Sequence, residues 1–349
     1  MNYKDIVDRT AKELIEHDDW RKAFRRYADN IKDATNTYKA AAGILKKHLP
    51  SKMGSLRIYS SIQLVQKSTK CAYFDLRIYG QSVGGLTVKN DELYLTVTKD
   101  QQEKNRDHLK IETKAHPAKK PYHWDSNEAK EIIKTFVEYK GEGADLRSEE
   151  HKYESLILHD LVNTSSNNKY ITYCRPVMLG EYGFFQMRTA LAASKHKPKY
   201  AMGDRGAKGG GIDILARIAH KNGSWRLAVM ELKDDNKAPE SQPVVMTQAM
   251  IYATFIGYLL RDTDRGKLWW NIFRNKEDEK NVNAHLDIDV ITVMPPDKTG
   301  KLPESKSEEI CIPGIDNVTL HPYSLYVDVD PKKSKIIGIS GSLCEVKKQ

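Results

Sequence analysis

The sequence has little cysteine, and its cysteines do not form a recognisable framework. Cys71, Cys174, Cys311 and Cys344 are scattered through 349 residues without any Cys-x-x-Cys pair. This distribution is typical of reduced thiols in a cytosolic protein, and it argues against a disulfide scaffold or a zinc site. We therefore expect a cytoplasmic chain in which the cysteines are small, buried residues.

Several other signals are missing as well. No apolar run reaches the roughly eighteen residues of a membrane-spanning helix, and the first residues do not resemble a signal peptide. The sequence has no internal repeat and no HExxH or GxSxG motif, and Gly209–Gly211 lacks the Gly-Lys-Ser/Thr of a P-loop. These absences argue against a membrane protein, a zinc protease, a serine hydrolase and a P-loop nucleotide hydrolase.

Basic residues, in contrast, are in excess. The chain has 56 Lys and Arg against 47 Asp and Glu, a net charge of +9, with 40% hydrophobic residues. The hydrophobic content is typical of a folded, soluble protein. The charge favours an anionic partner, which could be DNA, RNA or an anionic lipid surface.

A first domain is expected over residues 1–145. Residues 1–48 predict three helices, of which the second follows Asp18 or Asp19 and the third covers Asn36–His48. Residues 56–97 predict an antiparallel meander, and a capping box at 125–128 predicts a helix to about residue 139. We expect this α+β domain to serve in recognition or regulation.

The second predicted helix carries a basic cluster. It consists of Arg21, Lys22, Arg25 and Arg26. Such a cluster is typical of a solvated helix face, and contact with an anionic partner is the alternative.

A second domain is expected over residues 146–349. A helix should begin after Ser148, and strands are predicted at Tyr170–Leu179 and near Gly183–Met187. A hairpin, a long helix at Gln242–Leu260 and a strand at His285–Val293 follow. Two further strands are expected in residues 295–349.

The hairpin within Gly209–Lys233 is the main candidate for a functional site. Its two β-rich runs are joined at Asn222-Gly223, a strong hairpin signal. Asp213 and Glu231 interrupt the apolar runs, and Lys233 shares a strand face with Glu231. Pairing of the strands would bring two carboxylates and an ammonium together. Such carboxylates bind a hard cation such as Mg²⁺, and a nearby lysine can orient an attacking water.

The motif Asp213…Glu231-Leu232-Lys233 resembles that of the PD-(D/E)XK nuclease superfamily. Gln248 and Tyr252, four residues apart on the following helix, resemble the QxxxY motif of its RecB-like branch. The resemblance covers about residues 148–294. It implies a restriction-endonuclease-like αβββαβ core, a Mg²⁺ cofactor with Mn²⁺ as a substitute, and DNA as the substrate.

The resemblance also implies roles for individual residues. Asp213 and Glu231 would bind the metal with the Leu232 carbonyl, Lys233 would position the water, and Gln248 would orient the site. The first helix of the fold commonly supplies one more acid. Glu154 is our choice, because it lies on the apolar face of its helix and needs a partner there, and Glu150 is the reserve.

A basic segment precedes the glycines. Phosphate contacts are expected from Lys195, Lys197, Lys199, Arg205 and Lys208, together with Tyr252. A solvated loop is the equal alternative for the basic residues. Trp269 and Trp270 either pack in the core, which we prefer, or offer a stacking surface for bases.

The sequence therefore predicts a metal-dependent nuclease with a role in restriction or phage defence. The alternatives are a silent nucleic-acid-binding module of the same fold and an interaction protein with an acidic partner. RNA as substrate, strand preference and homodimer formation stay open.

Overall fold

The computed structural model describes most of the chain. The described ranges are 2–51, 53–62, 70–98, 121–139, 149–162, 174–179, 183–193, 197–203, 206–220, 225–233, 241–274, 285–296, 308–330 and 335–341. Over these residues it is a mixed α/β protein with two mixed sheets and six helices.

The chain divides into two compact units. The first comprises Met1–Asp29, Leu156–Val177 and Gln186–Gln349, and the second comprises Asn30–Ser155 and Met178–Phe185. Each unit is therefore built from segments distant in sequence. The predicted domain boundary between residues 145 and 146 is a single cut, and it stays a prediction.

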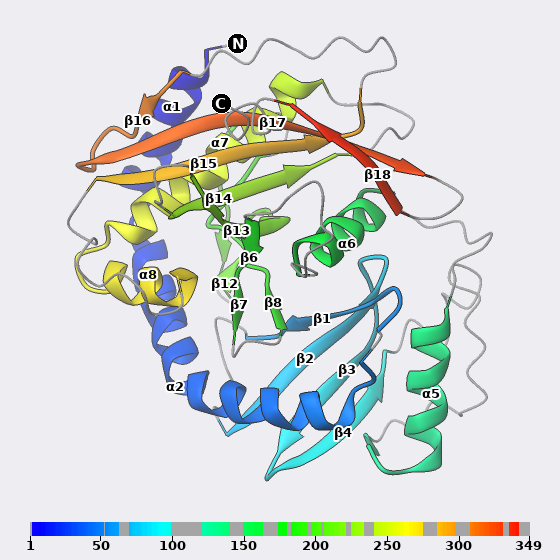
Figure 1. The fold of residues 1–349 in the computed structure, drawn as a ribbon. Coiled ribbons are helices and arrows are strands. Elements are labelled where there is room, and N and C mark those ends of the chain that lie inside the picture. The colour runs from blue at the N-terminus through cyan, green and yellow to red at the C-terminus, as the bar shows by residue number, and fades with distance from the viewer. Residues whose placement is uncertain are drawn as a thin grey trace. The chain divides into compact units, whose positions relative to one another are not determined.

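The first unit contains a seven-stranded sheet in the order β16-β17-β15-β14-β13-β6, with β18 beside β17 (Figure 1). Its strands are β6 (Cys174–Pro176), β13 (Ile214–Ala219), β14 (Trp225–Leu232), β15 (Leu286–Met294), β16 (Ile310–Cys311), β17 (Val318–Asp330) and β18 (Lys335–Ser340). Strands β6, β13 and β14 are antiparallel neighbours, whereas β14, β15 and β17 run parallel. The predicted hairpin and the predicted strand after the long helix are thus both part of this sheet.

Helix α7 (Gln242–Leu260) connects β14 to β15 and packs on β14, β15 and β17. Pro243 at its start fits the first turn, where a backbone N–H has no helical partner. Among the described helices, α7 alone is long and apolar enough to cross a membrane by length and composition, but 83% of its apolar window is buried inside the protein. Its apolar residues therefore form the core of this unit.

The strand register sorts the sheet's side chains onto two faces. Residues directly opposite one another on paired strands point to the same side. Leu227 of β14 pairs with Ile288 of β15, so their side chains lie on one face of the sheet. Val318 of β17 lies on the same face, where Gly257 of α7 approaches it. Arg226 and Asp287 belong to the opposite face, where side chains of β15 and β17 form a polar network.

Three more helices complete the first unit. They are α1 (Tyr3–Glu16), which packs on α7, the first third of α2 (Asp19–His48), and α8 (Gly266–Arg274). Trp20 and Phe24 of α2 pack edge-to-face on Phe255 of α7. Aromatic contacts of this kind contribute about 0.5–1.5 kcal/mol beyond burial. Helix α6 (Glu149–Val162) begins in the second unit and ends in the first.

The second unit contains a sheet in the order β5-β4-β3-β2-β1-β8-β7. Its elements are β1 (Leu56–Ser60), β2 (Cys71–Ile78), β3 (Gln81–Lys89), β4 (Glu92–Val97), β5 (Tyr122–His123), β7 (Met178–Leu179), β8 (Gly183–Phe185) and helix α5 (Asn127–Glu138). The predicted antiparallel meander is confirmed in β1 to β4. The predicted cap of α5 is confirmed too, because the Ser126 side chain accepts a hydrogen bond from the Ala129 N–H.

Three predictions of the sequence analysis are wrong. The second and third helices are one continuous helix, α2, because no Gly or Pro interrupts residues 19–42 and the Thr35 hydroxyl donates to the Ile31 carbonyl within it. The strand predicted over residues 170–179 is split between the two sheets as β6 and β7, and its residues 170–173 lie outside the described part. Cys311 is exposed on the short edge strand β16, whereas Cys71 and Cys174 are buried as expected.

Candidate active site

Asp213 lies at the end of the β13–β14 ladder, next to Glu231. The last pair of the ladder joins Ile214 to Met230, and one further step of the same register sets Asp213 opposite Glu231. The Leu232 N–H donates to Asp213 Oδ2 over 2.8 Å. The hairpin therefore holds the Asp213 carboxylate against the backbone that carries Glu231 and Leu232.

Glu231 and Lys233 form an ion pair at this position. Lys233 Nζ lies 3.5 Å from Glu231 Oε1, and the two side chains are only 19% and 6% exposed. A carboxylate buried to this extent is stable in its charged form only with close polar or cationic partners. The pair is thus more than the loose, solvated contact that an arbitrary Glu-x-Lys would make.

Tyr252 of α7 faces the same three charges. Burial raises the pKa of its hydroxyl, and the negative charges of Glu231 and Asp213 raise it further, while Lys233 acts in the opposite direction. The phenol therefore stays protonated at neutral pH and remains able to donate a hydrogen bond. Gln248 lies one helical turn before Tyr252 and is half-buried, so the predicted helix presents both residues as its spacing required.

Gly210 covers the Tyr252 hydroxyl. A Cβ atom at position 210 would lie 1.8 Å from Tyr252 Oη, so only glycine fits there. The backbone is fixed by two hydrogen bonds, from the Thr189 N–H to the Gly210 carbonyl and from the Gly210 N–H to the Leu191 carbonyl. The glycine at this position thus lets a backbone approach Tyr252 closely.

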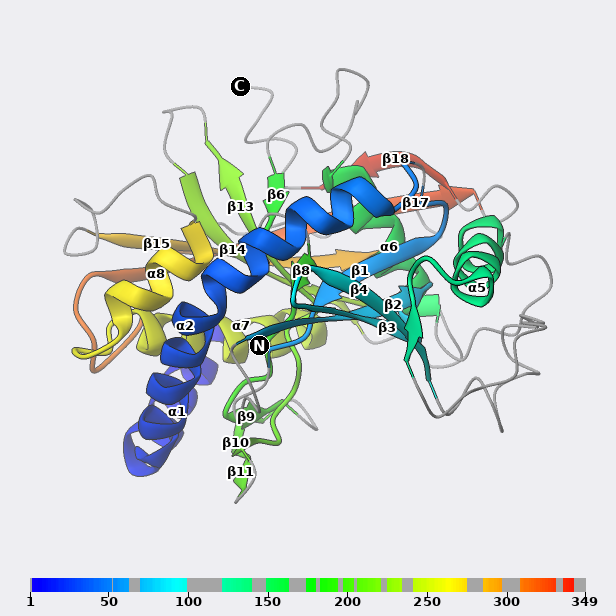
Figure 2. The same cartoon turned by 90° about the horizontal axis from the view of Figure 1, so that it is seen from below.

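The basic segment next to these glycines forms two short strand pairs. They are β9 (Leu191–Ala192) with β10 (Lys199–Tyr200), and β11 (Met202–Gly203) with β12 (Gly206–Ala207). In Figure 2 these strands extend away from α7. Lys197, Lys199 and Lys208 are exposed there, whereas Lys195 and Arg205 lie outside the described residues, as does the predicted Asn222-Gly223 turn.

Glu154 has a protein partner in the second unit. Its side chain is buried, and the Tyr59 hydroxyl donates to Glu154 Oε1 over 2.6 Å. Burial and then the charge of Glu154 raise the pKa of Tyr59, and the Arg77 guanidinium lies 4.1 Å from the centre of the Tyr59 ring. Tyr59 thus supplies a partner for the buried acid, and a role of Glu154 in metal binding stays a prediction. The side chain of the reserve, Glu150, lies outside the described residues.

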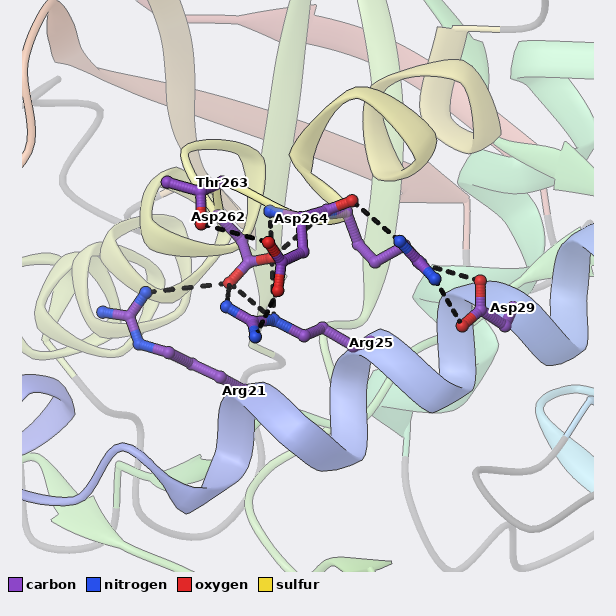
Figure 3. A network of polar contacts seen from close by, with 7 residues as sticks. Arg21, Arg25, Asp29, Asp262, Thr263 and Asp264 are labelled. Atoms are coloured by element: carbon purple, nitrogen blue, oxygen red, sulfur yellow. Dashed lines mark hydrogen bonds and ion pairs between the residues drawn. The ribbon is translucent and has the colours of Figure 1, made fainter.

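Two residues of the basic cluster of α2, Arg21 and Arg25, have a structural role, whereas Lys22 and Arg26 are exposed. Figure 3 shows Arg21 and Arg25 directed at Asp262 in the loop between α7 and α8. Arg25 donates through Nε and Nη2 to the Asp262 carboxylate, and Arg21 lies 3.8 Å from it. Trp269 is fully buried against Tyr27 and Phe24, which confirms the core assignment over the stacking surface.

Sequence reasoning missed Tyr59, Asp262 and the position of Gly210 over Tyr252. The only local signal for any of them was the glycine triplet itself. The partners of Tyr59 and Asp262 lie 95 and 237 residues away in sequence, where local patterns carry no information.

Within the described residues, no group of three or more His, Cys, Asp or Glu side chains is arranged to hold a metal ion. Any cation at the hairpin would therefore rest on the two carboxylates, Asp213 and Glu231, with backbone, water or substrate oxygens. Comparison of the chain with protein-family models, with curated proteins and with solved structures finds no significant match in any of the three.

Proposed function

We propose that the chain is a Mg²⁺-dependent nuclease of the PD-(D/E)XK type that cleaves DNA. The observation that carries the proposal is the cluster at the end of β13 and β14. There Asp213 accepts the Leu232 N–H, and Glu231 pairs with Lys233. Tyr252 supports it further, because the charges of all three side chains act on its hydroxyl.

The order of elements supports the same proposal. Apart from the short strands β7 to β12, and α8 before β15, the chain runs through α6, β6, β13, β14, α7 and β15, which is a helix, three strands, a helix and a strand. The first three strands are antiparallel neighbours, and the fourth lies parallel to β14 after the crossover through α7. This arrangement agrees with the restriction-endonuclease-like core that the sequence motif implies.

The donor set fits magnesium. Mg²⁺ is commonly held by one or two carboxylates, and water and substrate phosphate supply its other ligands. Asp213 and Glu231 are two carboxylates on adjacent strand ends, and the Leu232 carbonyl lies in the same backbone stretch. Bound there, the ion would neutralise phosphoryl charge and lower the pKa of water.

The protein groups then have separate tasks. The Lys233 ammonium orients the attacking water and stabilises the negative charge that builds at the phosphorus oxygens. The protonated Tyr252 hydroxyl, fixed under Gly210, limits where Glu231 and Lys233 can move. Gln248 orients the substrate from the same helix face. The exposed lysines at 197, 199 and 208 contact phosphates and position the strand.

The decisive experiment measures cleavage of the nucleic acid separately from its binding. Single-turnover cleavage in Mg²⁺ and equilibrium binding in Ca²⁺ are measured for wild type, Asp213→Asn, Glu231→Gln and Lys233→Ala. The substrates are single-stranded DNA, duplex DNA and RNA. Lys233→Ala should slow cleavage by about 100-fold or more, because it removes a preorganised group that acts mainly on the transition state, and it should leave binding nearly unchanged.

Matched controls are available on α1. Lys12 and Asp8 are exposed there, so Lys12→Ala and Asp8→Asn remove the same charges far from the hairpin in sequence. Binding without cleavage by the wild type would favour the silent binding module instead. Equal losses of rate and affinity in Lys233→Ala would contradict the role given to Lys233.

A further inference from the structure

Two arginines and a tryptophan share the sheet face of the candidate active site. Arg175 of β6 lies directly opposite Arg217 of β13, and Trp225 of β14 lies opposite Ala219. Arg217 is four residues from Asp213, which directly precedes β13, so extended alternation sets both side chains on one face.

The tryptophan orients one of the two arginines. The Arg175 guanidinium lies 5.6 Å from the centre of the Trp225 ring, within the range of a cation–π contact. To reach that ring from β6 it must cross β13, and the small side chain of Ala219 leaves the space for it. Arg175 is exposed, and a guanidinium stacked in this way keeps its N–H groups in a fixed plane.

Cβ atoms directly opposite one another on neighbouring strands are about 4.5–5.5 Å apart. Two guanidinium groups at such positions can both donate hydrogen bonds to one anion. Arginine matches the oxygens of a phosphate particularly well, because its planar fork can donate two parallel hydrogen bonds.

We infer that Arg175 and Arg217 together bind one backbone phosphate of the nucleic acid, at a fixed distance from the bond that is cut. The inference rests on the proposed function. Four residues along β13 span about 13 Å at about 3.3 Å per residue. The bound phosphate therefore lies on the order of 13 Å from the one at Asp213 and Glu231.

Binding is measured in Ca²⁺ as a function of salt for wild type, Arg175→Ala, Arg217→Ala and the double variant, on duplex DNA. Each single variant should bind about tenfold more weakly at about 0.1 M salt, since hydrogen bonds between charged groups contribute enough for such a factor. Because both arginines serve one phosphate, the double variant should flatten the plot of log K against log salt by about 0.9, the share of one phosphate, and not by twice that.

Two further variants test the geometry. Trp225→Leu removes no charge, yet it should weaken binding through loss of the stacked orientation of Arg175, and Arg175→Lys should not restore wild-type affinity. Arg9→Ala, at an exposed position of α1, is the matched control. The melting temperature of each variant shows whether it folds. Arg175→Lys, on the exposed edge strand, should stay folded.

The outcomes are distinguishable. A wild type that neither binds nor cuts nucleic acid overturns the proposed function and this inference with it. A wild type that binds and cuts, with both arginine variants indistinguishable from Arg9→Ala, overturns the inference alone. A double variant whose salt plot flattens by about two phosphates also overturns it, because the arginines would then serve different phosphates.

Discussion

Replacing Asp262 should lower the stability of the first unit more than replacing any other acidic residue in a surface loop. Its side chain is only 2% exposed, and it accepts hydrogen bonds from Arg25 and from the N–H groups of Asp264 and Arg265. Asp262→Ala removes the capping-type bonds, typically about 1 kcal/mol. It also breaks an ion pair, which costs about 3–5 kcal/mol when both partners are buried.

The Arg25 side chain is 34% exposed, so the cost of breaking its ion pair with Asp262 must be reduced for solvent screening. We expect Asp262→Ala to lower the free energy of unfolding by about 3 kcal/mol. Asp262→Asn keeps an oxygen acceptor for the two N–H groups and loses only the charge, so we expect about 1–2 kcal/mol.

The assay is urea unfolding followed by tryptophan fluorescence, since Trp20 and Trp269 are buried in this unit. A double-mutant cycle with Arg25→Ala isolates the pair, and its coupling energy should be about 1–2 kcal/mol. A coupling energy below about 0.5 kcal/mol would refute the reasoning, because Arg25 would then contribute independently of Asp262.

The ion pair between Asp262 and Arg25 also makes the free energy of unfolding depend on pH. Burial opposes ionisation of Asp262, but the hydrogen bonds from Arg25 and the Arg265 backbone outweigh it and set its pKa below the ordinary value. A depressed carboxyl pKa contributes stability above the unfolded value of about 3.9 and loses it as the pH falls through the folded value. The stability difference between wild type and Asp262→Asn should therefore narrow below about pH 3.9; a constant difference would argue against a charge effect.

Three further predictions concern the site and the second unit. DNA affinity should fall steeply between about 50 and 200 mM salt, because several lysine–phosphate contacts release counterions; an affinity indifferent to salt would count against a phosphate-tracking surface. Gly210→Ala should slow cleavage at least tenfold in a single-turnover assay, since its Cβ would collide with Tyr252 Oη, and an unchanged rate would show that Tyr252 need not stay fixed. Tyr59→Phe should lower the unfolding free energy by about 1–3 kcal/mol, measured by thermal melting, because it leaves buried Glu154 without its 2.6 Å donor; Tyr73→Phe is the control.

Local sequence was sufficient for the hairpin and the helix after it. Asp213, Glu231 and Lys233 lie within one hairpin, and alternation along a strand determines which of them share a face. Tyr252 follows one helix later, where the 3.6-residue period determines its face. Each of these relations spans few residues, so a periodic pattern could reveal it.

Relations between distant segments could not be predicted in the same way. Arg25 looked like part of a solvated basic face, because its partner Asp262 is 237 residues away. The separate helix expected from Asn36 was wrong for a related reason, since tertiary packing buries Ile31 and Tyr38 on either side of that position and keeps α2 continuous. The split of the strand at 174–179 likewise depends on Gly183, whose missing Cβ lets β8 approach Ser60 of β1.

The path of the chain between its two units also bears on how the protein is made. Trp20, Phe24 and Arg25 belong to the first unit, yet the chain then builds most of the second before returning to supply their partners on α7 and α8. At a synthesis rate of about 5–20 residues per second, the 237 residues between Arg25 and Asp262 take about 12–47 s to emerge. During that interval the aromatic face of α2 lacks its native partners, and exposed apolar surface of this kind favours aggregation of a nascent chain.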